Sequence, residues 1–248
     1  NAPRYTAGKI LVLNFPSVEV GSIIHLEYTK ISYNKPFFSD IFYFRNEYPI
    51  EEMSLTVNVP NDLPLKVNTL NAEALNYTTI KNANMTTHKW MGQDLIAIVP
   101  EVSTAPLWVF IPCIELSDGN LNSYLQTLNS GMKALANNQI ETTKVALETT
   151  KDLKTDKDKI IAIRNYISKM IVNSGPSFTN LPITEMSKSD ITLKDGYGNS
   201  ADISILYYAM LHTIGLPSEF VLSFQYPNLK QLITPLSNPL QRDYLTLF

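Results

Sequence analysis

The stretch DGYGNSAD at residues 195–202 runs directly into ISILYYAMLHTIGLP at residues 203–217. The second run is almost wholly apolar, and it is closed by Gly215 and Pro217, two residue types that end helices. It therefore predicts a single helix built for a protein core. Its buried face is expected to consist of Ile203, Leu206, Tyr207, Met210, Leu211 and Ile214.

The residues just before this helix determine what chemistry its N-terminus can support. Asn199 or Ser200 is placed to cap the helix, and Asp202 adds a favourable negative charge to the first turn. Free backbone N–H groups and the positive end of the helix dipole lower a thiol pKa there and stabilise an oxyanion. A serine hydroxyl gains much less, because it still needs a base.

Composition places the chain among globular proteins. It has 248 residues, of which 44% are hydrophobic and 17% charged, enough for one large domain or two ordinary ones. Lys and Arg number 20 against 23 Asp and Glu, so the formal net charge is −3. This balance, without any basic cluster, argues against a nucleic-acid partner.

The first part of the chain predicts an antiparallel β-sandwich over residues 1–115. Short apolar runs are separated there by Pro, Asn, Gly and Asp, and in the run at residues 53–60 apolar and polar residues alternate. Strands are expected in KILVLNF (9–15), SIIHLEYTKI (22–31), DIFYFRNEY (40–48), MSLTVNVP (53–60), DLIAIVP (94–100) and PLWVFIPCIEL (106–116).

Residues 116–248 predict a second, α+β domain, because the hydrophobic period changes there from two to about 3.6. Thr155 followed by Asp158 is a capping-box signature, so one helix is expected to begin near Asp156. Residues 173–198 look like a long surface connection, which is uncommon unless it has a function. Helices are expected in residues 121–138, 140–153 and 157–172, and a strand is expected at residues 221–224.

Several kinds of site are disfavoured by residue counts. The single cysteine, Cys113, excludes an intrachain disulfide and any cysteine-rich metal site, and it is interpreted as a core residue. We predict neither a metal nor a cofactor. The longest apolar stretch, residues 203–216, is too short for a transmembrane segment.

The run GYGNSADISILYYAMLHTIGLPSEFVLS at residues 196–223 resembles the active-site segment of transglutaminase-like proteins, which have a papain-like α+β fold. In these proteins a G-D-C-x-D motif opens a helix that leads into a strand. DKIIAIRNYISKMIV at residues 158–172 is similar to the helix that introduces their catalytic half. Residues 15–31 and 44–60 resemble the β-rich domain of unknown function, DUF3857, that precedes this module in many bacterial, often exported, proteins.

The same resemblance assigns positions in the site and shows two departures. Gly198 and Asp202 hold their family positions, whereas Ser200 stands where the family has its nucleophilic cysteine and Asn199 where it has an aspartate. The family histidine is expected on a later strand. The corresponding stretch, NPLQRDYLTLF at residues 238–248, offers Asp243 or the preceding arginine and no histidine.

The three histidines all precede that stretch. His212 lies twelve residues after Ser200, roughly 18 Å along a helix, and is interpreted as a surface or helix-end residue. His25 is expected on a sheet face and His88 in a turn.

A groove is expected above Ser200, walled by the connection at residues 173–198 and by the strand after Val221. Tyr197, Gly198, Asn199 and Asp202 are its expected binding residues. The apolar residues of the connection either grip an extended ligand or simply pin the connection to the domain. These residues are Phe178, Leu181, Ile183, Met186 and Tyr197.

Three hypotheses for function remain open. The chain is a non-catalytic transglutaminase-like module whose cleft binds a peptide, protein or glycan. Alternatively, it is a fragment or active-site variant of a thiol amidase, protease or acyltransferase, or an assembly scaffold that acts through its β-domain. The resemblance further implies an exported, periplasmic or cell-envelope protein, and an end at YLTLF, where a strand has barely begun, suggests C-terminal truncation.

Overall fold

A computed structural model describes residues 4–5, 11–31, 38–99, 107–118, 121–178, 181–224 and 244–247. The chain forms two compact units. The helical unit consists of residues 1–35 and 138–217, and the β-unit of residues 36–137 and 218–248. The fold is α+β with antiparallel sheets in its N-terminal part, as predicted, whereas the predicted domain boundary at residue 115 stays a prediction.

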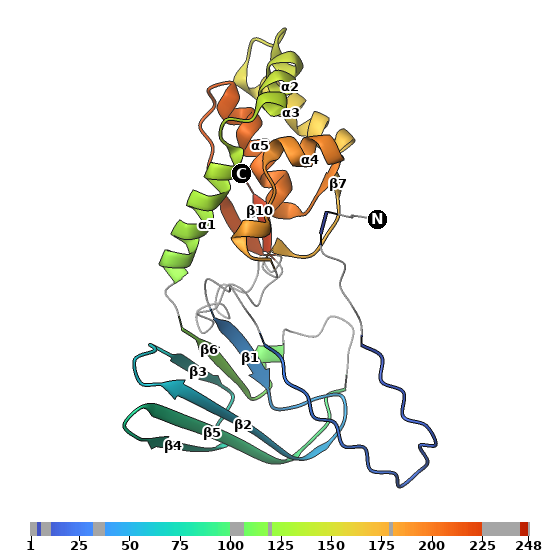
Figure 1. The fold of residues 1–248 in the computed structure, drawn as a ribbon, viewed down its shortest axis with the longest axis vertical. Helices are drawn as coiled ribbons and strands as arrows, with labels where there is room; N and C mark the ends of the chain where they lie inside the picture. Colours follow the sequence, from blue (N-terminus) through green and yellow to red (C-terminus); the bar gives the residue numbers. More distant parts are fainter. Residues whose placement is uncertain are drawn as a thin grey trace. The chain divides into compact units, whose positions relative to one another are not determined.

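The β-unit contains two three-stranded antiparallel sheets (Figure 1). In the first sheet β6 lies between β1 and β3, and in the second β5 lies between β2 and β4. The unit also contains α1 and the antiparallel pair formed by β9 and β10. The bounds are β1 (Ser39–Tyr43), β2 (Ile50–Pro60), β3 (Lys66–Leu70), β4 (Asn76–Lys81), β5 (Met85–Leu95), a 3-10 turn (Leu107–Val109), β6 (Cys113–Ser117), α1 (Leu121–Ala136), β9 (Val221–Phe224) and β10 (Tyr244–Leu247).

A shared core joins the two sheets. Trp90 of β5 is only 2% exposed and packs in one cluster with Ile114 and Leu116 of β6 and with Phe44 and Leu75. Residues from both sheets therefore face one another, which is the arrangement of a β-sandwich.

Four of the expected strands differ in the structure. The one expected at residues 106–116 begins only at Cys113, after the 3-10 turn at Leu107–Val109. Residues 11–31 contain no strand, and the chain drawn in blue runs there without an arrow (Figure 1). His25, expected on a sheet face, is exposed within this segment. A strand requires a hydrogen-bonded neighbour, and alternation in the sequence indicates only which face a strand would bury.

A further difference concerns β5. Of the residues described in the strand expected at 94–100, only 94 and 95 are in a strand, at the end of β5. Strand β5 instead covers the stretch around His88, which was expected to hold a turn. His88 therefore lies inside β5, where its Nδ1 is 2.8 Å from the Tyr77 hydroxyl. Pairing with both β2 and β4 outweighs the weak strand propensity of this polar stretch.

The helical unit is built from four helices and one short parallel strand pair, β7 with β8, within the residues described for it. The predicted capping box is confirmed, because the Thr155 hydroxyl accepts a hydrogen bond from the Asp158 backbone N–H (3.1 Å). The bounds are α2 (Ile140–Thr150), α3 (Asp156–Met170), β7 (Val172–Asn173), a 3-10 turn (Ile183–Glu185), α4 (Ser189–Asp195), β8 (Tyr197–Gly198) and α5 (Ser200–Thr213).

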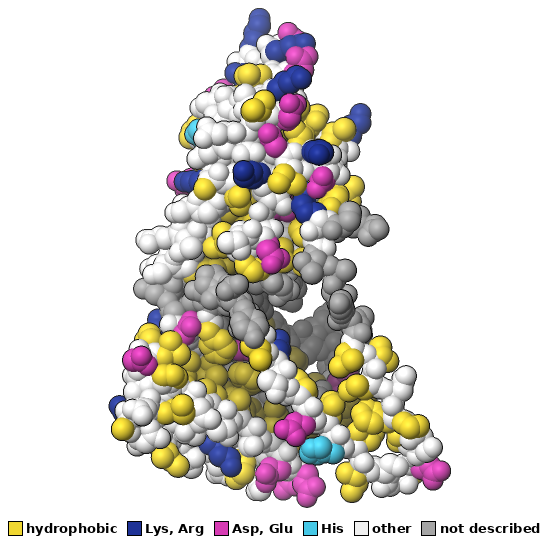
Figure 2. Space-filling model, in the orientation of Figure 1, with side chains coloured by type: hydrophobic (Ala, Val, Ile, Leu, Met, Phe, Trp, Pro, Cys, Tyr) yellow, Lys and Arg dark blue, Asp and Glu magenta, His cyan; other side chains and the backbone are white. Residues whose placement is uncertain are grey.

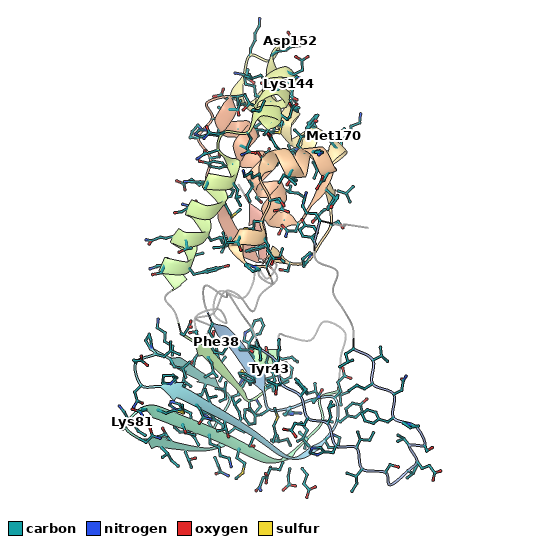
Figure 3. All side chains as sticks on the ribbon, in the orientation of Figure 1. Phe38, Tyr43, Lys81, Lys144, Asp152 and Met170 are labelled. Carbon is teal, nitrogen blue, oxygen red and sulfur yellow. The ribbon has the colours of Figure 1, made fainter. Side chains whose placement is uncertain are left out.

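Helix α5 is the centre of this unit. Leu206, Tyr207, Met210 and Leu211 are buried as predicted, and they pack with Ile163, Ile167 and Ile171 of the α3 region. Ile160 and Met170 of α3 are exposed, and Met170 points outward (Figure 3). Within the unit α5 packs on α2, α3, α4 and β8. The long connection thus contributes a helix, α4, that contacts α5.

Helix α4 also caps α2 from a distance. Gln139, at the α2 N-cap, makes no side-chain capping bond. Instead Asp190 of α4 accepts hydrogen bonds from the backbone N–H groups of Glu141 (3.2 Å) and Thr142 (2.8 Å). Burial alone raises the pKa of Asp190, but the bonds from the Thr142 side chain and these backbone groups outweigh it and lower that pKa below 3.8.

We expect Asp190→Asn to destabilise the protein by about 1 kcal/mol at pH 7, the usual contribution of a helix cap. Because the folded pKa is lowered, this contribution is present above the unfolded pKa of about 3.9 and disappears as pH falls through the folded value. Urea unfolding at pH 7 and at pH 2.5 measures both effects. A difference between wild type and Asp190→Asn that is as large at pH 2.5 as at pH 7 contradicts the capping role.

Candidate functional site

The candidate site lies at the start of α5, and we call residues 197–202 the α5 head. The backbone enters it through Gly196, whose φ of 71° is left-handed and whose N–H closes the last turn of α4. Strand β8 is then held beside β7 by backbone bonds from Val172 N to Gly196 O and from Ser174 N to Gly198 O, both 2.9 Å. Two elements that precede α5 thus position its first residues.

Asn199 is the N-cap of α5, one of the two caps that the sequence allows. Its side-chain oxygen accepts a hydrogen bond from the Asp202 N–H at 3.0 Å. The side chain is 2% exposed, and its Nδ2 has no hydrogen-bond partner among the described residues. Ser200 follows as the first helical residue and is half-buried, and its carbonyl accepts a bond from the Ser204 hydroxyl (2.7 Å).

Asp202 is the buried charge of the site. It is fully buried, and both of its carboxylate oxygens are used. Oδ1 accepts a hydrogen bond from the Ser187 N–H at 2.8 Å. Oδ2 accepts one from the Tyr5 hydroxyl at 2.6 Å and is 3.1 Å from Nη2 of Arg4. The carboxylate therefore joins the connection, the α5 head and the beginning of the chain.

Arg4 and Tyr5 are the unexpected part of the site. The Tyr5 hydroxyl donates to Asp202 and accepts from the Asn199 N–H, both at 2.6 Å. Burial raises the pKa of Tyr5 to about 12, and the bond to Asp202 acts in the same direction. The phenol is therefore protonated at neutral pH and remains a donor.

Arg4 is held at three points. Nη1 forms an ion pair with Asp195 at 2.7 Å, and Nη2 reaches both Asp202 and the Tyr197 carbonyl, the latter at 2.8 Å. Its backbone N–H donates to the Tyr197 hydroxyl at 2.8 Å. The guanidinium carbon also lies 4.7 Å from the centre of the Tyr197 ring, a cation–π distance.

Two glycines make room for this arrangement. A side-chain carbon added to Gly175 would lie 2.3 Å from Cε2 of Tyr5, so only glycine leaves space for the phenol ring. At Gly198 an added carbon would lie 2.9 Å from Cβ of Asp202. Glycine at these positions is therefore a steric requirement of the site.

The connection at residues 173–198 is pinned to the unit at two points. Phe178 is 2% and Met186 5% exposed, so these two apolar residues are not available to grip a ligand. Leu181, Ile183 and Tyr197 are half-buried. Phe178 and Met186 therefore pin the connection to the unit, which is one of the two roles expected for its apolar residues.

Other predicted residues lie away from the α5 head. His212 is exposed in the last turn of α5, where its ring stacks 5.8 Å from that of Tyr208. Asp243, the position expected for the family histidine, lies outside the described residues. Cys113 is fully buried as expected, and burial raises the pKa of its thiol to about 12.

Neither a metal site nor a membrane helix occurs in the part of the chain that the structure describes. No three His, Cys, Asp or Glu residues are grouped there so that they could hold a metal ion. No helix in those same ranges combines the length and hydropathy that crossing a bilayer requires.

A hollow lies in the β-unit and was not predicted. Its volume is about 580 Å³, and it lies beside β1 and the start of β2. Apolar side chains dominate its lining, with Arg45 and Glu47 at its polar part. Tyr43, one of the lining residues, is visible at the end of β1 in Figure 3.

Sequence reasoning therefore found the α5 head but missed Arg4, Tyr5, Ser187 and Gly175. Asn199 and Tyr5 are separated by 194 positions, so no local spacing connects them. The only signal was Gly175 in the connection, a residue type that often marks a close approach of another group.

Comparison with known proteins assigns two families to the chain. Residues 1–99 match the model of DUF3857, a domain of unknown function, and residues 143–239 match the transglutaminase-like superfamily. The chain thus combines a DUF3857 region with a transglutaminase-like domain, and the resemblance stated from the sequence is confirmed.

One solved structure is similar over most of the chain. It is the crystal structure of a proposed protease from Parabacteroides distasonis, with a TM-score of 0.65 and 20% sequence identity. The match covers 79% of this chain but only 38% of that protein, so this chain spans well under half of its length. At this identity the similarity shows the fold alone. No curated protein matches the chain.

Proposed function

We propose that the chain is a non-catalytic transglutaminase-like module that binds a peptide at the α5 head. The observation that carries this proposal is the state of Asp202. Both of its oxygens accept hydrogen bonds, and its second oxygen also pairs with Arg4. A carboxylate used in this way is not free to take a proton from Ser200.

Ser200 needs such a base, because an alcohol is a weak nucleophile without one. In the described part of the chain, the Ser200 hydroxyl makes no hydrogen bond to an acidic or imidazole side chain. His212 is at the opposite end of α5 and is exposed. The orphan N–H groups of a helix start remain useful for binding even when they support no reaction.

A peptide is favoured over a glycan by the chemistry of the α5 head. Its polar groups include a buried carboxylate, backbone N–H and carbonyl groups and the Asn199 amide, next to an aromatic ring, Tyr197. Such a mixture recognises side chains and backbone of an extended chain. An exported or cell-envelope location is part of the same proposal and rests on the resemblance to DUF3857-containing proteins.

We expect purified protein to show no amine incorporation and no peptidase turnover, and we expect Ser200→Cys alone to restore neither. A fluorescent-amine incorporation assay and a peptide-library hydrolysis assay measure this. Ser200→Ala is the control. Turnover in the wild type that Ser200→Ala abolishes would contradict the proposal and show that a base acts on Ser200.

A scaffold role through the β-unit is the second candidate, and the hollow beside β1 is the observation that favours it. Ser200→Trp separates the two, because Ser200 is half-buried at the α5 head and a tryptophan there adds a bulky side chain to that surface. Binding that survives Ser200→Trp with an unchanged melting temperature assigns the ligand to the β-unit.

A further inference from the structure

Arg4 and Tyr5 are bound at the α5 head in the way a ligand is bound. Six polar contacts connect this pair to Asp195, Tyr197, Asn199 and Asp202, and they range from 2.6 to 3.1 Å. Tyr5 is only 8% exposed, although it belongs neither to the core cluster around α5 nor to the one around Trp90.

The receiving side is complementary in charge and in shape. Two carboxylates, Asp195 and Asp202, face the guanidinium, and the Tyr197 ring covers it. The phenol fits beside Gly175, and its hydroxyl lies between one donor, the Asn199 N–H, and one acceptor, Asp202. A lysine cannot reproduce the forked contacts of Nη1 and Nη2, and a phenylalanine lacks the hydroxyl.

The residues described next along the chain, 11–31, do not share the burial of this pair. All residues from 11 to 31 are exposed, including eleven large hydrophobic side chains such as Val20 and Ile23. Yellow side chains along this segment are visible in Figure 2. Among the described residues 4–5 and 11–31, burial is therefore confined to the pair.

We propose that the α5 head is a recognition site for an arginine–tyrosine pair in a peptide, and that Arg4 and Tyr5 are its resident occupant, which such a peptide displaces. This inference rests on the proposed binding function and names its ligand class. The resident pair regulates the site, because a peptide binds only the fraction of molecules in which the pair has left.

The strength of this regulation depends on the covalent attachment of the resident pair to the same chain as the site. A tethered segment competes at an effective concentration of millimolar order. The apparent dissociation constant rises by the inverse of the open fraction. A resident pair that occupies about nine molecules in ten therefore weakens peptide binding about tenfold.

The probe is the acetylated and amidated peptide Ala-Pro-Arg-Tyr-Thr-Ala, which has the sequence of residues 2–7. It is titrated by calorimetry into the wild-type chain and into the chain with Arg4→Ala together with Tyr5→Ala. We expect the dissociation constant to be at least about tenfold lower for the double variant. Peptides with lysine for arginine, or phenylalanine for tyrosine, are expected to bind the variant at least about tenfold more weakly, because each loses charge-assisted bonds.

Gly175→Ala and Gly215→Ala form a matched pair of variants. Both glycines have positive φ, 118° and 77°, so alanine strains both backbones. A side-chain carbon added at Gly175 would meet the Tyr5 ring, whereas one added at Gly215 would have nothing within 4 Å. Introduced into the double variant, Gly175→Ala is expected to abolish peptide binding and Gly215→Ala to leave it.

Three results overturn the inference: equal affinity for wild type and double variant, no binding to either, or binding that survives Gly175→Ala. None of these binding results measures turnover, so the activity assays test the non-catalytic assignment separately. If the double variant does not fold, as judged by circular dichroism, the wild type is titrated with 3-fluorotyrosine peptide up to millimolar concentration. A saturable fluorine shift that Tyr5→Phe strengthens then supports the inference, and its absence overturns it.

Discussion

Asp202→Ala is expected to lower the free energy of unfolding by about 3 kcal/mol, because it leaves buried donors without an acceptor. The Ser187 N–H and the Tyr5 hydroxyl both lose their partner, and Arg4 loses one of its two carboxylates. Each buried donor left unsatisfied costs about 1–3 kcal/mol, although Arg4, with 16% of its side chain exposed, regains water. Urea unfolding followed by circular dichroism measures the change.

Asp195→Ala is the matched control for this prediction. Asp195 contacts the same arginine at 2.7 Å, but 28% of its side chain is exposed. An ion pair of that kind contributes about 0–1 kcal/mol, so we expect a change no larger than this. Equal losses for the two variants would mean that the Arg4 charge, rather than the buried hydrogen bonds, makes Asp202 important.

Trp90→Ala is expected to destabilise the β-unit by about 3–5 kcal/mol, the usual range for removing a buried aromatic side chain. Trp90 is 2% exposed, and it contacts residues of both sheets within one core cluster. Its ring also stacks on that of Tyr77, with centroids 5.0 Å apart. The loss therefore combines transfer free energy with a large cavity between the sheets.

Ile80→Ala in the neighbouring strand β4 is the control, because Ile80 is 69% exposed. We expect a change within about 0.5 kcal/mol. Thermal unfolding of the two variants and the wild type compares them directly. A loss below about 1 kcal/mol for Trp90→Ala would mean that the two sheets do not share the core described here.

Local signals in the sequence predicted where α3 and α5 begin. The Thr155–Asp158 capping bond was expected and forms, and of the two caps allowed for α5, Asn199 is the one that bonds to Asp202. A cap joins residues three positions apart, so its geometry depends on the local sequence alone. Periodicity placed Leu206, Tyr207, Met210 and Leu211 of α5 in the core correctly. Ile203 and Ile214 are only half-buried, and Ile205, Tyr208 and Ala209, outside the predicted face, are buried as well.

The sheets were less predictable, because strand pairing joins residues that are distant in the sequence. The polar stretch of β5 becomes the central strand of its sheet, whereas the apolar run at residues 22–31 forms no strand. Periodicity described the faces these segments would have, and it carried no information on their partners. Helix α4 was missed because its seven residues are too few to show a helical period.

By itself the sequence determined where α5 begins, with Asp202 in its first turn and Asn199 or Ser200 as its cap, together with the DUF3857 and transglutaminase-like character of the two parts. Only the tertiary structure decided what Asp202 does. Its partners Ser187, Arg4 and Tyr5 lie 15, 198 and 197 positions away, and Gly175 leaves the space for the phenol. A buried carboxylate requires donors from somewhere in the fold, but their identity depends on which segments the folded chain brings to it.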